Sequence, residues 1–597
     1  MNKNVIKDVI ISFLVSIILS LSYNISLNTI EMKNLTYTSN VIWVIFAIAF
    51  YIVIQFYRKN IKSTKRLTIL STIVSIVIAG LFTIGQLFTD YTFQNADFTL
   101  KLFEFITLKF ILYFVINKYL ISIAYYEMEN IKEENNDKKS IKYNKKNFLI
   151  ITLIIFLAYI PWLLNYYPGI CSLDSLSQML QATGFRQLSS HHPVIHTMII
   201  KICLAIGKLI NNYNTGIAIY SILQMICSAM TFSYVVLYLG KKKVSKTVQI
   251  ILLLFFMFFP IIANFTITMW KDIPFALCIL ITTTYIIDMF TEKDFFDKKK
   301  NYILLSIFLL LDCLFRKNGL YCVALLLVVM MFIKIKNKRI VLLTILIPII
   351  ISVILTGPIY NILKIQPGDT KEAYSVFMQQ FAAIRQYNSS QLTNKEKKEL
   401  DRFFIDKSYI KLYDPVFADP VKRVFSEEYI KKNKAKMIKT YLKYSIKFPK
   451  TTIKAFISGN YGYFYPNIIG WEVYNRIDSR PELNIKQTPI VKLPFITRQN
   501  ELLNTHNITI IGTLCSCGIY ALLLIFVIGY YIYKKQLKML PSTILIIGVE
   551  LTAMLSPVFC ERRYVYSIFL VTPLLLALCF SKNINKKIRK TEVLKES

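Results

Sequence analysis

The sequence contains few charged residues. They make up 18% of the 597 residues, whereas a soluble domain carries about 25%. Hydrophobic residues make up 55% of the chain, and the mean hydropathy is +0.47. This composition excludes an ordinary soluble domain and predicts a polytopic membrane protein, in which each span needs about 20 apolar residues.

Three other features are missing from the chain. No small-residue cleavage site follows the first apolar run at 9–27, so this run predicts a first span rather than a removed signal peptide. No tandem repeat is present, which argues against a transporter built from internal repeats. No H-E-x-x-H motif accompanies the histidines, which disfavours a zinc protease.

Acidic residues are scarce relative to basic ones. The chain has 35 Asp and Glu residues against 71 Lys and Arg residues, a formal net charge of +36. A strongly basic chain can indicate nucleic-acid binding. Here the positive charge is divided into short clusters between apolar runs, and the positive-inside rule for membrane proteins explains that pattern. No nucleic-acid partner is therefore expected.

About fourteen apolar runs divide the chain into blocks. They predict an all-α polytopic membrane protein with about 14 transmembrane helices. The stretch from 361 to 507 is too polar to span and is large enough to form a small α-rich domain. The predicted units are a four-span block at 1–127, a basic linker at 128–147, a core at 148–360 that includes the loop 166–215, the domain at 361–507, and a three-span block with a tail at 508–597.

The basic clusters between spans predict the orientation of the chain. If they are cytoplasmic, both termini lie inside, and the loop 166–215 and the domain 361–507 lie on the extracytoplasmic face. This holds only if 193–211 does not cross the membrane. That segment carries Lys201 and Lys208 and is barely long enough to span, so we expect an interfacial or re-entrant helix.

An acidic residue stands out in this loop, within YPGICSLDSLSQ. Pro168 and Gly169 end the incoming helix, and a helical pattern then resumes with Asp174 and Gln178 four residues apart on one face. The Asp174 carboxylate could deprotonate an acceptor hydroxyl or ligate a cation. The alternative is that it caps the N-terminus of the helix.

Three of the four histidines of the chain, His191, His192 and His196, follow in SSHHPVIHT. His192 and His196 are four residues apart, a spacing that places two imidazoles on one face of a helix. They could bind a metal ion with Asp174 as a third ligand, or contact a phosphate group or a sugar hydroxyl. The alternative is an interfacial helix with partly hydrated histidines.

Basic residues recur at the predicted extracytoplasmic ends of spans, in TMWKD, FRKNG and CERRY. Because they break the positive-inside pattern, they favour a bound lipid phosphate, which arginine can hold through two parallel hydrogen bonds. The alternatives are snorkelling to headgroups and, for Lys271 and Asp272, a surface ion pair. The basic residues concerned are Lys271, Arg316, Lys317, Arg562 and Arg563, and the acidic Asp272 follows Lys271.

Residues 148–597 resemble the GT-C superfamily of polytopic glycosyltransferases, which use polyprenyl-phosphate-linked sugars. The motifs quoted above also look like those of an uncharacterised family of membrane proteins from Gram-positive bacteria. The resemblance implies a GT-C-like core, an acidic residue matching Asp174, membrane-parallel helices near 173–184 and 193–210, and basic residues that hold the lipid phosphate. Many GT-C members carry two adjacent acids here, whereas Ser175 follows Asp174, so an obligatory metal is in doubt.

We therefore expect a cell-membrane glycosyltransferase that moves a sugar from a polyprenyl-phosphate donor to a glycan or cell-wall polymer acceptor on the extracytoplasmic face, in contact with membrane lipids. No cofactor is required, and a divalent cation stays open. The alternatives are a transporter or flippase, a polymerase or ligase of lipid-linked glycans, and a scaffold. The expected catalytic residues are Asp174, His191 and His192, and the expected substrate-binding residues are Gln178, His196, Lys271, Asp272, Arg316, Lys317, Arg562 and Arg563.

Overall fold

The computed structural model is all-helical. No β-strand occurs in the part of the chain that it describes, where extended pairing is limited to isolated bridges. The predicted all-α class is therefore confirmed. The predicted basic tail beyond Ser581 and much of the linker 128–147 lie outside the described residues. The described ranges are 3–24, 37–90, 100–130, 140–368, 371–466, 470–504, 510–556 and 558–581.

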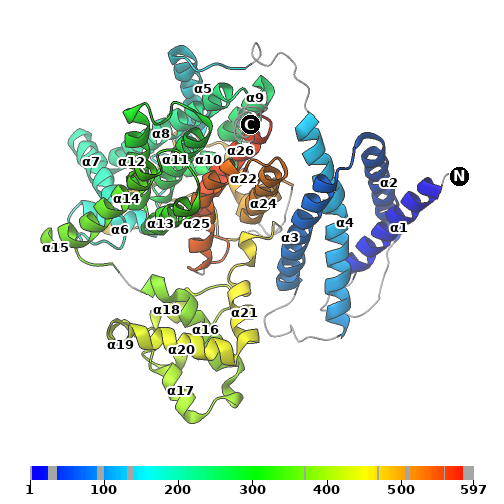
Figure 1. The fold of residues 1–597 in the computed structure, drawn as a ribbon. Coiled ribbons are helices and arrows are strands. Elements are labelled where there is room, and N and C mark those ends of the chain that lie inside the picture. Colours follow the sequence, from blue (N-terminus) through cyan, green and yellow to red (C-terminus); the bar gives the residue numbers. More distant parts are fainter. Residues whose placement is uncertain are drawn as a thin grey trace.

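The N-terminal block stands beside the main bundle (Figure 1). Its last helix contributes Tyr125, whose hydroxyl donates to Phe526 O at 2.8 Å, and Glu129, whose carboxylate is 2.6 Å from Lys534 Nζ. A Cβ added to Gly529 would lie 2.4 Å from Tyr125 Oη, so the two parts approach closely. The block consists of α1 (Lys3–Asn24), α2 (Tyr37–Asn60), α3 (Lys65–Asp90) and α4 (Leu100–Asn130).

The main bundle buries one large apolar core. Its helices are joined mostly by short turns, and α9 and α10 are bent by 55° at Pro260, which cannot donate a backbone hydrogen bond. The bundle consists of α5 (Lys145–Asn165), α8 (Tyr213–Lys241), α9 (Lys246–Phe258), α10 (Pro260–Thr266), α11 (Asp272–Thr291), α12 (Lys299–Phe315), α13 (Lys317–Phe332), α14 (Lys338–Ile354), α24 (Cys517–Tyr533), α25 (Ile544–Met554) and α26 (Tyr566–Cys579).

Many of these helices can cross a membrane. Among the described residues, 8 helical stretches are long and apolar enough, or up to 9 if α9 and α10 form one bent span. Large apolar side chains along α14, such as Ile347 and Ile350, are exposed, which suits contact with lipid. The protein is thus a helical multi-pass membrane protein, while the number of fourteen spans stays a prediction.

Two helices between α5 and α8 are not among these candidate spans. They are α6 (Leu173–Ala182) and α7 (Val194–Ile210), so helices near 173–184 and 193–210 are confirmed. α7 packs antiparallel on the first turns of α8, where a Cβ on Gly207 would lie 2.1 Å from Gly216 N.

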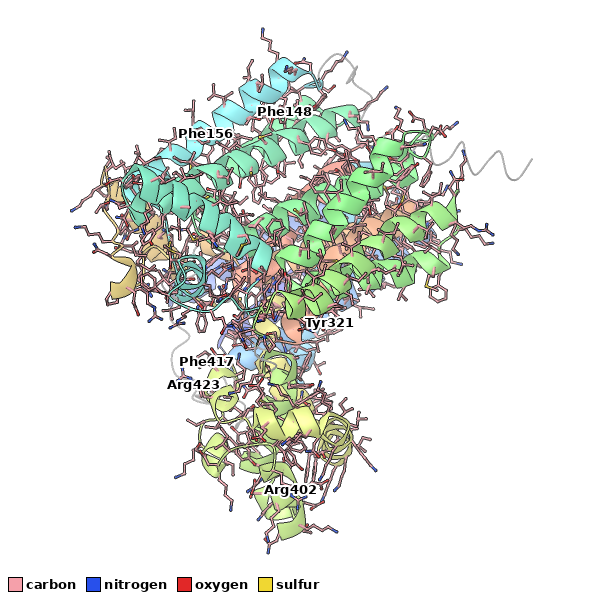
Figure 2. The ribbon with its side chains drawn as sticks, turned by 90° about the vertical axis from the view of Figure 1, so that its left-hand side faces the viewer. Phe148, Phe156, Tyr321, Arg402, Phe417 and Arg423 are labelled. Carbon is pink, nitrogen blue, oxygen red and sulfur yellow. The ribbon has the colours of Figure 1, made fainter. Side chains whose placement is uncertain are left out.

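A helical lobe projects from one end of the bundle and has its own apolar core. Figure 2 shows Tyr321 of α13 at the end of the bundle that faces the lobe. Phe417 lies on the side of the lobe nearest the bundle, and Arg402 lies far from the bundle. The α-rich content predicted for 361–507 is therefore present. The lobe helices are α16 (Ser375–Tyr387), α17 (Asn394–Asp401), α18 (Asp419–Arg423), α19 (Glu427–Lys432), α20 (Lys434–Lys447) and α21 (Pro449–Ser458).

The chain returns from the lobe along the same end of the bundle. Phe417 of the lobe and Trp471 of this return segment have ring centroids 5.6 Å apart. The segment continues through α22 (Pro494–Asn504) and, after a gap in the described residues, α23 (Ile510–Leu514). The return segment also borders the loop between α5 and α6, because Cys171 N donates to Arg476 O at 3.2 Å.

Candidate functional site

The loop after α5 is held between two distant segments. Ile170 N donates to Ile267 O at 3.0 Å, and Met269 N donates back to Ile170 O at 2.9 Å. On the other side, Cys171 N donates to Arg476 O at 3.2 Å, and Asp478 N donates to Cys171 O at 3.0 Å. These backbone pairings fix the start of α6 beside the start of α11.

Side chains complete this attachment. Ser172 is the N-cap of α6, so the alternative that Asp174 caps the helix is wrong. Trp270 Nε1 donates to Ser172 Oγ at 2.7 Å, and Ser175 Oγ donates to Met269 O at 2.7 Å. Asp174 lies in the first turn of α6, where the helix dipole stabilises a carboxylate.

Asp174 is paired with two cations from other parts of the chain. Its Oδ2 accepts from Arg563 Nη1 at 2.8 Å and lies 3.9 Å from Lys271 Nζ. Arg563 also lies over the Trp270 ring, 5.0 Å from its centroid. Burial alone would raise the pKa of the Asp174 carboxyl, but Arg563 and Lys271 outweigh it and hold that pKa well below its usual range. Asp174 is therefore ionised.

His192 contacts the same lysine. Its Nδ1 lies 3.1 Å from Lys271 Nζ, and because an ammonium only donates, Nδ1 is the acceptor and Nε2 carries the proton. Burial, followed by the charge of Lys271, lowers the pKa of His192 to about 2, so the imidazole is neutral. We call Asp174, His192, Lys271 and Arg563 the Asp174 cluster.

Asp272 pairs with an arginine from another part of the chain. It does not pair with its neighbour Lys271; its Oδ1 lies 3.2 Å from Arg316 Nη1, and both groups are buried. Arg316 Nη1 also donates to Tyr564 O at 2.7 Å. The interpretation of Lys271 and Asp272 as a mutual ion pair is therefore wrong, because Lys271 contacts His192 whereas Asp272 contacts Arg316.

Arg562 and Arg563 have separate roles in the structure. Arg562 is buried, and it donates to Cys515 O at 3.0 Å and Trp471 O at 2.7 Å. It therefore ties the return segment to the bundle, whereas Arg563 faces Asp174. The sequence could not separate these neighbours.

His196 and Gln178 belong to a buried hydrogen-bond network of their own. His196 Nδ1 lies 3.0 Å from Gln178 Oε1, and its Nε2 lies 2.7 Å from Tyr220 Oη. Tyr220 donates to Gln224, whose Nε2 donates to carbonyls of residues 265, 266 and 268. The prediction that His192 and His196 share a helix face is wrong, because α7 begins only at Val194.

His191 and Lys317 lie on the exposed side, beside the chain that enters the lobe. A Cβ on Gly368 would lie 2.7 Å from His191 Cα and 2.8 Å from Lys317 Nζ. The His191 and His192 ring centroids are 4.7 Å apart. His191 is therefore adjacent to the Asp174 cluster.

Sequence reasoning missed several polar residues near the site. Trp270, Ser172 and Tyr564 carry the contacts described above. Asp312 is fully buried near the end of α12 and accepts from Thr282 Oγ1 at 2.9 Å. An acid inside an apolar run was the available signal for Asp312, whereas a capping serine has no signal that marks it as functional.

No group of three potential metal ligands occurs in the described part of the chain. Both ring nitrogens of His196 are engaged by Gln178 and Tyr220, so His196 does not face Asp174. Asp174 and His192 are linked through Lys271 instead. A divalent cation stays a prediction.

A cavity of about 550 Å³ opens between the end of α5 and the start of α22. None of the predicted site residues lines it. Its lining residues are Asn165, Tyr166, Gln487, Pro489, Lys492, Leu493, Pro494, Thr497, Arg498 and Glu501.

A known protein family covers most of the chain. Residues 182–593 match a family of unknown function, DUF6020. The chain belongs to this family. The DUF6020 match contains Lys271 and Arg563 and begins after Asp174. No curated protein and no solved structure matches the chain.

Proposed function

We propose that the protein is a membrane glycosyltransferase that moves a sugar from a polyprenyl-phosphate donor to a glycan or cell-wall polymer acceptor. The observation that supports this most is the Asp174 cluster, because it joins a carboxylate, a neutral imidazole and two cations from distant segments at one end of a membrane bundle. Such a set can bind a lipid phosphate and activate a hydroxyl.

In this proposal, the residues of the Asp174 cluster have different roles in the transfer reaction. Arg563 and Lys271 stabilise the charge on the departing lipid phosphate, which is the larger electrostatic effect. Asp174 accepts the proton of the acceptor hydroxyl or orients it through a cation. His192 and the exposed His191 position the phosphate or acceptor. Arg562, Arg316, Gln178 and His196 support the site instead of touching substrate.

The proposed topology has about fourteen spans, both termini in the cytoplasm and the site on the extracytoplasmic face. The basic clusters in the sequence support it. Cysteine labelling with a reagent added outside the cell tests this topology. One variant carries a single cysteine near Asp174, and the other carries one in the loop 240–246 between α8 and α9. The proposal requires labelling near Asp174 alone.

Asp174→Asn tests the enzymatic role. We expect transfer from polyprenyl-phosphate monosaccharides to fall by about 10²–10⁴-fold, because the proton acceptor is removed. Membrane insertion should be unchanged. Asp478→Asn is a matched control, since Asp478 pairs with Arg476 at 3.4 Å next to the same loop. Full activity of Asp174→Asn would refute the role.

Transport of a lipid-linked glycan is the second candidate function. Asp312 Oδ1 and Glu550 Oε1 are buried in the bundle without a hydrogen-bond partner, and intramembrane carboxyls often serve proton coupling. Proteoliposomes loaded with a fluorescent lipid-linked glycan would separate the functions. Transport would need flux that Asp312→Asn abolishes; a polymerase or ligase would leave a single-sugar donor unused.

A further inference from the structure

Two cations in the Asp174 cluster converge on a single oxygen atom. Asp174 Oδ2 is 2.8 Å from Arg563 Nη1 and 3.9 Å from Lys271 Nζ. We propose that the Asp174 carboxylate occupies the phosphate site of the substrate-free protein, and that a bound lipid phosphate takes over Arg563 and Lys271 and releases the carboxylate. The inference rests on the proposed function, since it assigns the released carboxylate to the acceptor.

Arg563 has donors that the carboxylate does not use. Its Nε is buried without a hydrogen-bond partner, and the nearest other anion, Glu561 Oε2, is 3.6 Å away. A guanidinium presents its N–H groups as a rigid fork, and a phosphate offers more acceptor oxygens than the one carboxylate oxygen used here. A phosphate therefore satisfies Arg563 more completely than Asp174 does.

The exchange is confined to Arg563 and Lys271. Arg562 is held by two backbone carbonyls, and Arg316 by the Tyr564 carbonyl and the Asp272 carboxylate. Lys271 is oriented toward the site by His192 Nδ1 at 3.1 Å. The Asp174 side chain is 37% exposed, so it has room to leave the cations.

Carboxylate and phosphate compete in this arrangement because both are anions that need the same two cations. Holding both at once would place like charges together, which is unfavourable. Removal of the Asp174 charge should therefore strengthen phosphate binding. A carboxylate that merely helped to bind substrate would give the opposite result.

The test measures binding of sugar-free polyprenyl phosphate to the full-length protein in nanodiscs. We expect Asp174→Asn to bind about tenfold more tightly than wild type, since the competing ion pairs are gone. Asp478→Asn should bind like wild type. Uncharged polyprenol should bind equally to all three, which separates the phosphate from the lipid chain. Unchanged or weaker binding of polyprenyl phosphate by Asp174→Asn would overturn the proposal.

A double-mutant cycle guards against indirect effects. Arg563→Gln should weaken phosphate binding, and the gain from Asp174→Asn should disappear when Arg563→Gln is also present. A gain that persists in the double variant would contradict the exchange. If Asp174→Asn binds polyprenyl phosphate more tightly yet transfers sugar normally, the proposed function fails and the exchange stands. If transfer is lost without tighter binding, the proposed function stands and the exchange fails.

Discussion

Charged side chains gather at both ends of the bundle, and the two groups differ in how completely they are paired. At the end opposite the lobe, Lys242 Nζ lies 2.6 Å from Asp288 Oδ1, 2.7 Å from Glu292 Oε1 and 2.7 Å from Thr291 Oγ1. An ammonium has three donors. The Lys242 side chain is only 4% exposed, so each of these donors has a protein partner.

At the candidate site, hydrogen-bonding groups are left over. Arg563 Nε and, beside it in the chain, Arg562 Nη2 are buried without a hydrogen-bond partner. Unsatisfied buried polar groups are costly and call for an explanation. The open donor of Arg563 suits a ligand that brings further acceptor oxygens, such as a phosphate.

Of the substitutions that test this difference between the two ends, removal of Arg563 should have the largest effect on activity. In Arg563→Gln we expect sugar transfer to fall by about 10²–10³-fold, because a donor to the departing phosphate is lost. The assay is transfer by purified protein. Arg476→Gln is the control, since Arg476 is 47% exposed and its side chain pairs with Glu472 instead of Asp174. Wild-type transfer by Arg563→Gln would mean that the leftover donors have no catalytic use.

Removal of Lys242 should affect stability instead. Lys242→Met leaves Asp288 and Glu292 without their buried cation, which costs about 3 kcal/mol. Thermal unfolding in detergent should show the loss, while transfer per folded molecule stays unchanged. Lys298→Met is the control, because Lys298 is 66% exposed and an ion pair in solvent, such as the one with Asp294, adds little to stability. A parallel loss of transfer would break the distinction between the two ends.

Much of the fold could be predicted because long apolar runs have few structural solutions. The sequence has apolar runs at 301–315 and 319–335. They correspond closely to α12 and α13, since Arg316 and Lys317 interrupt the apolar pattern between them. The bend within the run 248–266 was not predicted, although Pro260 marks it. A mean hydropathy over a window of residues does not detect such a break, because the residues on both sides of it are apolar.

The site could be predicted only as a collection of residues. Topology placed Asp174, Lys271 and Arg563 together, and they do meet. Which cation pairs with which anion depends on side-chain directions across segments far apart in sequence, as the pairing of Asp272 with Arg316 instead of its neighbour Lys271 shows. His196 illustrates the same limit, because its spacing from His192 could not reveal where α7 begins.

The smallest expected effect is a pH dependence of stability that belongs to the candidate site. Burial and Lys271 lower the pKa of His192 to about 2, from about 6.5 in an unfolded chain. Below pH 6.5 the unfolded protein therefore binds a proton that the folded protein refuses, so stability falls with pH, by about 2 kcal/mol at pH 5.

His192→Gln should remove this loss, because glutamine does not titrate and its amide oxygen can still accept from Lys271. Its unfolding temperature should fall less than that of wild type between pH 7.5 and pH 5. His196, whose pKa burial lowers to about 3, remains in both proteins and acts in the same direction, so its contribution cancels. Lys298→Met should keep the wild-type acid loss, because it removes only the exposed ion pair with Asp294. Equal pH dependence in His192→Gln and wild type would show that His192 binds a proton as readily in the folded as in the unfolded protein, which contradicts an imidazole that accepts a hydrogen bond from Lys271.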